Sequence, residues 1–538
     1  MPLNLLADPW IPVRRASGAQ SLIRVAEIAD QNDPPVALDW PRADFNLACL
    51  ELLTGLVFVA CPPKDDDAWW DVREAPPDPA ALDEALAPYV AAFELDGAGP
   101  RFLQDFEALD AGPTGVDALL IDASGGNTAR NNADLMVHRG RYAVFSRSAA
   151  AMALYTLQAF APSGGAGNRT SMRGGGPMVT LVEPRPGGEG GRPTLWDTVW
   201  ANVPDGRPLP LERMSESFPW MAPTPTSQTK GSEVHADPDR PPWQAFFGMP
   251  RRIRLLFEQA VSRRCDLTGA ADATVVTGFV QRPYGINYGH WMHPLTPYYR
   301  QKPGEVPLPV HPKPGRFGYC NWIGVALSDE PRNPDKVQRQ PAATVTGYTR
   351  NRGQPGEAVR LIVGGWAMDN MKPLDFIEAR QPLYVVEDDE RRKQLETAAL
   401  GLVRAGEIAA GELRMQLKRA IGLDSADKGA PAEASEAFFA RTENDFHEAL
   451  RRLSIELEAT APRKAWRRAL MAAALGEFDR RVLPGLTDRD PAGAETAVRA
   501  RGRLLSVLSG YGKRGQELYD AHLGLPVPEP ARKKEKAE

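Results

Sequence analysis

A glycine-rich stretch with two arginines is the part of this sequence whose residue types most directly suggest binding chemistry. Residues 161–177, APSGGAGNRTSMRGGGP, contain six glycines, two arginines, one asparagine and no acidic residue. Glycine lets the backbone approach a ligand closely and adopt positive φ, and arginine binds phosphates and base edges. The stretch therefore predicts a loop that contacts a nucleotide, a nucleic acid or another part of the protein.

The loop does not match the common nucleotide-binding motifs. A triphosphate-binding loop has the pattern G-x-x-x-x-G-K-[ST] between a strand and a helix, because the lysine and the helix N-terminus both contact phosphate. Here the second glycine run is followed by Pro177 and the strand-like run MVTLV, and the loop contains no lysine. The dinucleotide pattern G-x-G-x-x-G is also missing from the sequence. A nucleotide-dependent enzyme is therefore the weaker alternative.

Residues with the chemistry of a metal or catalytic site are few. His290 and His293 in HWMHP have a spacing that could chelate a cation, but no acidic or cysteine residue lies nearby in the sequence. The acidic run at residues 65–67 is more typical of a solvated helix start than of a cation site. The sequence has no G-x-S-x-G nucleophile motif, and its four cysteines form no CxxC pair. We predict a protein without catalytic residues, metal or cofactor.

Basic residues are concentrated locally, although the whole chain has a net charge of −5. Residues 1–127 carry 7 Lys and Arg against 22 Asp and Glu, whereas residues 128–173 carry six arginines against Asp134 alone. Residues 249–264 add five arginines against Glu258. A local basic surface can bind a polyanion while the total charge stays acidic. The alternative is that these arginines are scattered, solvated charges.

The composition is that of a soluble globular protein, with 43% hydrophobic and 25% charged residues. The N-terminus lacks the basic-then-apolar layout of a signal peptide, and separated cysteines suit a reducing compartment. The longest apolar run, residues 47–61, is short for a membrane span and contains Glu51, so it predicts a buried helix. We expect a cytoplasmic protein that does not insert into a membrane.

The amino-acid composition differs between two parts of the chain. Up to about residue 380, proline and glycine punctuate short β-rich runs, which predicts a mixed α/β domain with long loops over residues 1–380. Helices are expected at 42–60 and about 146–160. The clearest strand-like runs are 178–182, 252–257, 273–280 and 358–366.

The rest of the chain is rich in Ala, Leu, Arg and Glu and predicts helices. In the second of four helical stretches, Phe439, Phe446, Leu450, Leu453 and Leu457 form one apolar stripe. Amphipathic helices joined by short loops predict an antiparallel four-helix bundle over residues 381–525, and the polar residues 526–538 predict a disordered tail. The predicted fold class is thus α+β. The four helices are expected at about 387–420, 434–460, 462–483 and 493–511.

Taken together, the chain resembles the CasA family, the large subunit of the type I-E CRISPR surveillance complex called Cascade. The order and spacing of the matching stretches cover about two thirds of the chain. Four stretches carry the match: NLLADPWIPVRR (4–15), PRADFNLACLELLTGLVFVACPPKDDDAWW (41–70), GGAGNRTSMRGGGPMVTLV (164–182) and LIVGGWAMDN (361–370).

The resemblance implies a fold and a function. The family joins a mixed α/β domain to a C-terminal four-helix bundle and is not itself a catalyst. It recognises the protospacer-adjacent motif in double-stranded DNA, largely from the minor groove, and helps to open the duplex for pairing with the guide RNA. The expected partners are therefore double-stranded target DNA, the 5′ end of the guide RNA, the other Cascade subunits and the helicase–nuclease that degrades the target.

The resemblance also implies nucleic-acid contacts by particular residues. Arg264 falls where the family has a basic finger that reaches the motif, and Asn370 falls where some members have a glutamine that wedges under it. Residues 127–145 match a mobile loop near the guide's 5′ end, whose arginines are Arg130, Arg139 and Arg141. The positions that match the minor-groove loop and its phosphate contact are Gly164, Gly165, Ala166, Gly167, Asn168 and Arg169.

Structural roles compete with these assignments. Gly174, Gly175 and Gly176 are better explained as a turn into the following strand than as DNA contacts. The arginines at 251, 252 and 254 alternate with apolar residues, so they can line a solvated strand face. A protein whose glycines only shape a loop, as a structural scaffold, is the second alternative to a DNA-reading subunit.

Overall fold

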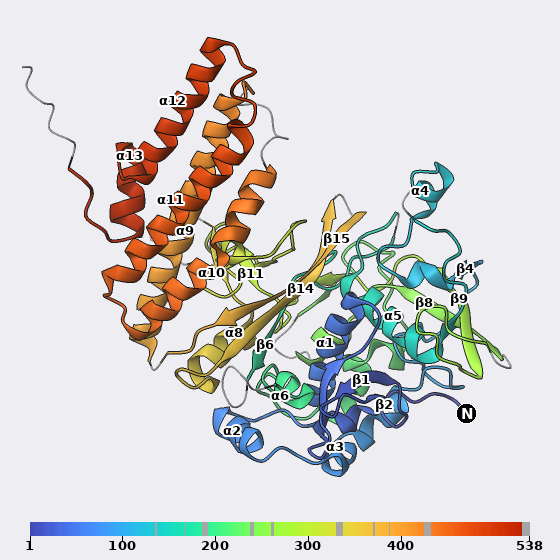
Figure 1. Ribbon diagram of the computed structural model, residues 1–538. Helices are drawn as coiled ribbons and strands as arrows, with labels where there is room; N and C mark the ends of the chain where they lie inside the picture. Colours follow the sequence, from blue (N-terminus) through green and yellow to red (C-terminus); the bar gives the residue numbers. More distant parts are fainter. Residues whose placement is uncertain are drawn as a thin grey trace, which may run out of the picture.

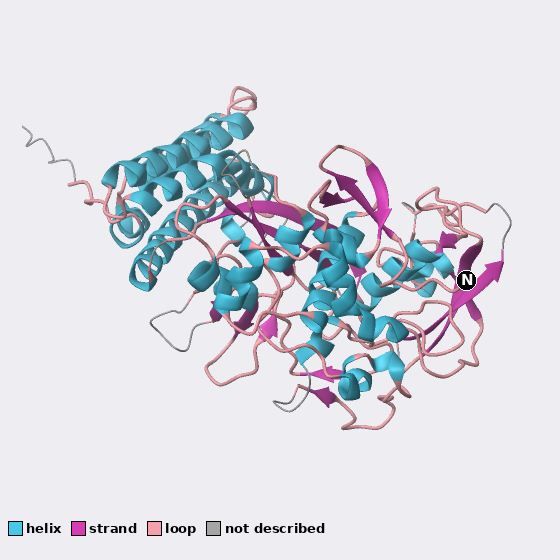
Figure 2. Cartoon of the chain, turned by 90° about the horizontal axis from the view of Figure 1, so that it is seen from below, coloured by secondary structure: helices cyan, strands magenta, loops and turns pink. Residues whose placement is uncertain are grey.

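The protein, described here from a computed structural model, has a mixed α/β N-terminal region and a C-terminal helical bundle (Figure 1). Helices, strands and loops alternate through the first region, whereas the second is built of helices (Figure 2). The predicted fold class is confirmed. The structure describes residues 1–134, 137–165, 167–185, 192–236, 242–259, 263–329, 337–369, 372–386, 388–423 and 432–529.

Two buried helices form the centre of the N-terminal region. Helix α1 (Ala43–Ala60) and helix α5 (Arg147–Phe160) pack against each other, and most of their residues are buried. Helix α5 begins at the N-cap Ser146, whose side chain accepts a hydrogen bond from the Ala149 N–H. By length and composition α1 is apolar enough to cross a membrane, but 89% of it is buried inside the protein. It is the buried helix that the sequence predicts.

Several small sheets surround these helices. Strands β6, β8, β9 and β14 confirm the four predicted strand-like runs, at 178–182, 252–257, 273–280 and 358–366. In hydrogen-bonded order, one sheet consists of β2 (Gln20–Ile23), β1 (Ile11–Arg15) and β3 (Pro35–Leu38), and another of β15 (Lys372–Leu383), β14 (Val359–Asp369) and β6 (Val179–Pro184). A further sheet consists of β4 (Pro113–Gly115), β9 (Thr274–Arg282) and β5 (Phe145–Ser146), and β8 (Arg252–Gln259) also pairs with β9. The smaller sheets consist of β12 (Leu308–Pro309), β11 (Tyr298–Arg300) and β13 (Gln338–Gln340), and of β7 (Val234–His235) with β10 (Tyr288–Gly289).

Short helices complete the N-terminal region. Asp65, in the acidic run, is the N-cap of α2 and accepts a hydrogen bond from the Ala68 N–H at 2.9 Å. The run is thus a helix start, as the sequence predicts. The helices are α2 (Asp66–Glu74), α3 (Pro79–Leu86), α4 (Gly126–Arg130), α6 (Leu195–Trp200), α7 (Met214–Ser217) and α8 (Ala343–Gly347).

The bundle consists of four long helices that pack side by side (Figure 1). Phe446, Leu450 and Leu453 of the predicted apolar stripe are buried, together with Trp466 of the third helix. Pro491 occupies the first turn of the fourth helix, where its missing N–H costs no hydrogen bond. The helices are α9 (Asp389–Ala420), α10 (Ala432–Ile455), α11 (Thr460–Val482) and α12 (Pro491–Leu508), followed by the short α13 (Gly512–Gln516).

An aromatic residue of the N-terminal region inserts into the bundle. Tyr319, in the short 3₁₀ helix η8 (Tyr319–Asn321), stacks on Phe446 with ring centroids 4.6 Å apart. Its hydroxyl forms a 2.9 Å hydrogen bond with the Thr442 hydroxyl. Burial of an aromatic ring with its polar end satisfied is a strong non-local contact. It holds the two regions together in addition to the chain connection between Leu383 and Asp389.

The change from strands to bundle helices follows β15. Strand β15 ends at Leu383 and α9 begins at Asp389, and the division into domains at residues 380 and 381 stays a prediction. Residues 530–538 lie outside the described residues, so the disordered tail stays a prediction.

Candidate nucleic-acid interface

The glycine-rich loop has one open edge and one packed edge. Gly164 and Gly165 are exposed, and a Cβ atom at Gly165 would meet nothing within 4 Å. In contrast, a Cβ at Gly174 would lie 2.9 Å from the His311 ring, and one at Gly176 would collide with the backbone of β14. The second glycine run is therefore a packed turn into β6, as the sequence predicts. Only the first run presents bare backbone.

The loop is tied to the end of β9 just after its open edge. The Gly167 carbonyl accepts a hydrogen bond from the Tyr284 N–H at 2.7 Å. The Asn168 side chain accepts one from Gln281 Nε2, also at 2.7 Å. Gly167 has φ +80°, and a side chain there would strike Pro283 and Tyr284. Glycine is thus required at 167 for a close approach within the protein.

Arg169 also bonds within the protein. Its Nε donates to the Ser227 hydroxyl at 2.8 Å, and its Nη2 donates to the Ser227 carbonyl at 2.9 Å. Ser227 in turn donates to the Gly285 carbonyl at 2.7 Å. The guanidinium therefore joins the loop to the turn after β9, and its contact with a phosphate stays a prediction. Ala166 lies outside the described residues.

A buried ion pair anchors the base of the loop. Arg173 Nη2 lies 2.6 Å from Glu51 Oε1 of α1, and both side chains are buried. A second donor, Nη1, lies 3.0 Å from Oε2, so the pair is bidentate. The buried ring of His293 faces the same carboxylate, with Nε2 3.5 Å from Oε1. The end of the loop is thereby fixed to the central helix α1.

The β14–β15 hairpin ends beside the loop. A Cβ at Gly175 would lie 3.4 Å from the Met368 sulfur near the end of β14. Asp369 pairs with Lys372 across the hairpin end, and Lys372 is exposed. Asn370, the predicted wedge, follows Asp369 but lies outside the described residues. The structure thus brings the hairpin end and the glycine loop together, which the sequence alone did not.

Arg264 lies at the opposite end of β9 from the glycine loop. It sits in the turn after β8, bridged to Ala271, and its exposed guanidinium donates to the Gly269 carbonyl at 3.0 Å. Strand β9 has nine residues, and at about 3.3 Å per residue its ends are roughly 26 Å apart. That length corresponds to about eight base pairs of B-DNA. Arg264 and the loop are therefore not brought together within this chain.

The residues predicted to approach the guide's 5′ end project around α4, away from the body of the protein (Figure 1). Arg130 and Arg141 are exposed. Arg139 is bound differently, because it forms an ion pair with the buried Asp134 at 2.5 Å and donates to the Ala129 carbonyl at 2.8 Å. Only two of the three arginines thus present unpaired charge there in the described part of the chain.

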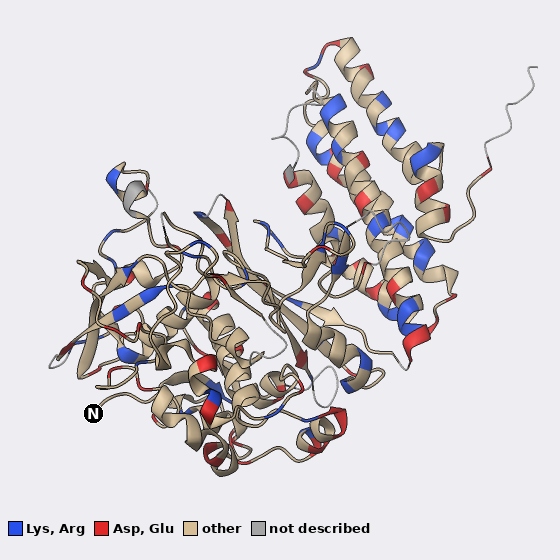
Figure 3. Cartoon of the chain, turned by 180° about the vertical axis from the view of Figure 1, so that it is seen from behind, with Lys and Arg blue, Asp and Glu red and all other residues tan. Residues whose placement is uncertain are grey.

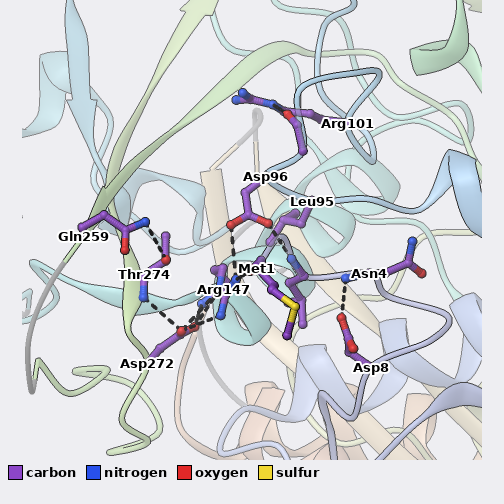
Figure 4. Close-up of polar contacts among 12 residues, drawn as sticks. Met1, Asn4, Asp8, Leu95, Asp96, Arg101, Arg147, Gln259, Asp272 and Thr274 are labelled. Carbon is purple, nitrogen blue, oxygen red and sulfur yellow. Dashed lines mark hydrogen bonds and ion pairs between the residues drawn. The ribbon is translucent and has the colours of Figure 1, made fainter.

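The basic stretch 128–173 does not form one basic surface. Arg147 contacts Asp272 at 2.9 Å and Asp96 at 3.3 Å, and it donates to the Met1 carbonyl at 2.8 Å (Figure 4). With Arg139, Arg169 and Arg173 also bonded internally, most of these arginines hold the fold together. Lys and Arg are scattered over the N-terminal region and are frequent on the bundle helices (Figure 3).

The arginines at the start of β8 are also not a solvated face, which corrects the sequence interpretation. Arg252 Nε lies 2.6 Å from Asp105 Oδ2, and Arg254 donates to the Asp105 carbonyl at 2.9 Å. Arg251 is buried. Their alternation with apolar residues correctly indicated a strand, but their partners lie about 150 residues earlier in the chain.

Two basic residues beside the loop were not identified from the sequence. Arg282 is exposed at the end of β9, next to the Pro283–Tyr284 turn that holds the loop. Lys372 is exposed at the hairpin end. Arg282 could have been predicted to lie at a strand end, because it stands between a β-rich run and a Pro-Tyr-Gly turn. Lys372 could be placed at the hairpin end only from the pairing register of β14 with β15.

The histidine spacing does not form a chelate. His290 is exposed and stacks on His235, with ring centroids 5.1 Å apart. His293 is buried against Phe246 and Glu51. Within the described residues, no three His, Cys, Asp or Glu side chains are grouped so that they could hold a metal ion.

Fold and surface thus define a class of protein: a mixed α/β region that presents an exposed glycine edge, joined to a docked helical bundle. The family model for CRISPR-associated protein Cse1 matches residues 4–476. The chain belongs to the Cse1 family, and the resemblance to CasA, another name for Cse1, is confirmed.

Solved structures have the same fold. Cse1 from Thermobifida fusca is 19% identical, with 96% of this chain and 98% of that chain covered and a TM-score of 0.69. Cse1 from Acidimicrobium ferrooxidans is 21% identical, with 94% and 98% covered and a TM-score of 0.65. A chain of a CRISPR RNA-guided surveillance complex is 16% identical, with 94% and 100% covered and a TM-score of 0.65.

Proposed function

We propose that this chain is the DNA-reading subunit of a CRISPR RNA-guided surveillance complex in the cytoplasm. It recognises a short protospacer-adjacent motif in double-stranded DNA from the minor groove and promotes opening of the duplex. Base pairing with the guide RNA then reads the remaining sequence. The chain itself is not a catalyst. Membership of the Cse1 family and the fold shared with a chain of such a complex support this proposal.

The open glycine edge is the observation that carries the proposal. The minor groove of B-DNA is only about 6 Å wide, so backbone without Cβ atoms can enter it more deeply than ordinary side chains. Gly164 and Gly165 are the exposed members of the first glycine run, and the Glu51–Arg173 pair anchors the end of the same loop.

The neighbouring β14–β15 hairpin supplies the opening step in this proposal. Its strands pair up to Asp369 and Lys372, and Asn370 follows Asp369 in the sequence. Insertion of its amide beside the motif unstacks one base step, which costs a few kcal/mol. Asn370→Ala is then expected to slow R-loop formation on intact duplex, and a pre-opened bubble beside the motif restores the rate.

The remaining partners follow from the family. The loop around α4 contacts the complex near the guide's 5′ end through Arg130 and Arg141, and the assembled subunit docks the helicase–nuclease. Arg169 contacts a phosphate in this proposal, and Arg264 belongs to the basic finger that reaches the motif. Loss of the Arg169 contact reduces the salt dependence of binding without changing sequence preference.

Gly164→Leu in the assembled complex tests the groove contact. Gly165 has φ +74°, so a side chain there would also strain the backbone, whereas Gly164 lies outside that region and has space for a Cβ. We expect binding of motif-bearing duplex to fall about tenfold or more, because the leucine blocks groove entry. Binding to a target strand that is already single-stranded changes about twofold or less.

Gly99→Leu is the matched control, because Gly99 is exposed in another loop and, like Gly164, has space for a Cβ. Equal loss on both substrates, or equal loss in the control, contradicts groove reading. Normal duplex binding by Gly164→Leu favours a structural scaffold. Nucleotide binding by the isolated chain that this substitution removes favours the enzyme alternative.

A further inference from the structure

Arg251 lies directly beneath the open glycine edge. It precedes β8, and its side chain is 7% exposed. The Nη2 atom donates to the Pro162 carbonyl. A Cβ at Gly164 would lie 3.9 Å from the same nitrogen. The guanidinium thus lies against Gly164.

This guanidinium differs from every other buried arginine in the described residues. Arg173, Arg352 and Arg392 are buried to a similar degree, and each contacts at least one carboxylate. Arg251 contacts none there, and its buried Nε has no hydrogen-bond partner in the described chain. A buried charge without a counter-charge is costly, so natural proteins normally pair it.

The charge nevertheless persists at neutral pH. Burial lowers the pKa of Arg251 to about 10, which leaves the side chain protonated at pH 7. The free protein therefore keeps a desolvated cation, with an unused Nε donor, beside the exposed residues Gly164 and Gly165. A planar cation with unused N–H groups is complementary to a phosphate oxygen, and such charge-assisted bonds are short and strong.

We propose that Arg251 binds a backbone phosphate of the DNA strand that lies against the Gly164–Gly165 edge. The inference rests on the proposed function and names the group that the loop recognises besides the groove. The phosphate supplies the counter-charge that the fold omits. Because phosphates carry no sequence information, Arg251 sets the position of the duplex on the loop and not the choice of motif.

A purely structural role is the competing explanation, since the side chain supports the Pro162 carbonyl. The backbone of Arg251 is held independently: its N–H donates to Gln158 Oε1 at 3.0 Å, and its carbonyl accepts from Gln158 Nε2 at 3.0 Å. Replacing the side chain therefore leaves the strand start in place. The two roles differ in charge, so the salt dependence of binding separates them.

The test compares Arg251→Met and Arg251→Lys with wild type in the assembled complex, on motif-bearing duplex over a range of salt concentrations. For Arg251→Met we expect about tenfold weaker binding at low salt. The slope of log K against log salt falls by about 0.9, the value for one phosphate contact. Arg251→Lys keeps the charge and therefore keeps most of the slope. The thermal stability of the free chain carrying Arg251→Met stays equal or rises, because an unpaired buried charge is removed.

The control is Arg14→Gln, which removes an exposed arginine of β1 that forms an ion pair with Asp39. Its salt slope stays that of wild type. Weaker binding by Arg251→Met with an unchanged slope overturns the proposal and leaves Arg251 as a support for Pro162. A slope that falls equally for Arg14→Gln also overturns it, because the effect is then one of net charge.

Inorganic phosphate distinguishes a DNA phosphate from a free anion. If phosphate raises the melting temperature of the wild-type chain but not of Arg251→Met, at ionic strength matched with chloride, the guanidinium is accessible to phosphate. If phosphate stabilises the wild-type chain in this way but Arg251→Met leaves the salt slope of DNA binding unchanged, the site binds a free anion, and the DNA assignment is overturned. Gly164→Leu tests groove reading separately, so a normal Arg251→Met complex with a defective Gly164→Leu complex refutes only the phosphate contact.

Discussion

Several ion pairs of the N-terminal region join residues that are far apart in the sequence, whereas several of those in the bundle join neighbours on one helix. Arg173 and Glu51 are 122 residues apart, and both are buried. On α12, Glu495 and Arg499 are four residues apart and exposed. Burial removes both charges from water and makes each dependent on its partner, whereas an exposed pair stays hydrated and screened. An arginine–glutamate pair therefore anchors a loop in one region and lies on the surface of a helix in the other.

The function proposed for each region follows from this difference. In the proposed function the loop enters a narrow groove, and the buried long-range pair Glu51–Arg173 anchors one end of it. The bundle derives its order from apolar stripes and from the Tyr319 contact. Substitutions at three ion pairs and at one buried histidine test whether burial determines the energetic role.

The largest effect is expected on breaking the pair beneath the loop. Arg173→Met leaves the Glu51 carboxylate buried without a partner, which costs about 3–5 kcal/mol of the free energy of unfolding. Denaturant unfolding of the full chain measures this cost. The double variant Glu51→Leu with Arg173→Met removes both charges and recovers much of the loss. If the single and double variants are equally destabilised, the loss comes from packing and not from the unpaired charge.

A smaller effect is expected from His293, which is buried beside the same pair. Burial, with the nearby charge of Arg173 adding to it, holds the pKa of His293 well below its usual value of about 6.5. The folded state thus keeps the ring neutral, while the unfolded chain takes up a proton as pH falls below about 6.5. The stability from this group is present above pH 6.5 and is lost below it, by up to about 1.4 kcal/mol per pH unit.

His293→Asn isolates that contribution. The Leu295 N–H donates to His293 Nδ1 at 3.1 Å, and an asparagine oxygen can accept the same bond. We expect the variant to lose stability less steeply between pH 6.5 and 5 than wild type in denaturant unfolding. His138→Asn, at an exposed histidine, is the matched control. An identical slope in wild type and His293→Asn would show that the ring is protonated in the folded state.

The contrast between local and long-range pairs also explains what the sequence predicted well. The four bundle helices were predicted to within a few residues, because a 3.6-residue period and nearby prolines are local signals. Within the stripe, Phe439 is only partly buried while its neighbour Phe438 is fully buried. Strands β6, β8, β9 and β14 were found from their β-rich runs for the same reason.

The candidate site was less predictable, because its partners are distant in sequence. Glu51 indicated that the apolar run was not a membrane span, but nothing near it pointed to Arg173. The six arginines of residues 128–173 were counted as a possible basic surface, and the structure shows four of them bonded internally. The separation of Arg264 from the loop depends on the register of β8 with β9, which no motif specifies.

The smallest effect is expected at the exposed pair on α12, and it decides whether spacing or burial sets the energy of a pair. In a double-mutant cycle with Glu495→Ala and Arg499→Ala, we expect a coupling of about 0.3–0.5 kcal/mol that weakens with salt. Glu477 and Arg481 on α11 have the same i, i+4 spacing, but the Glu477 side chain is only 1% exposed. The same cycle at Glu477 and Arg481 should therefore give a larger coupling that salt weakens less, since a buried carboxylate loses its hydration. Equal couplings at the two sites would mean that helical spacing, and not burial, governs the energy, and the contrast between the two regions would then be one of sequence distance alone.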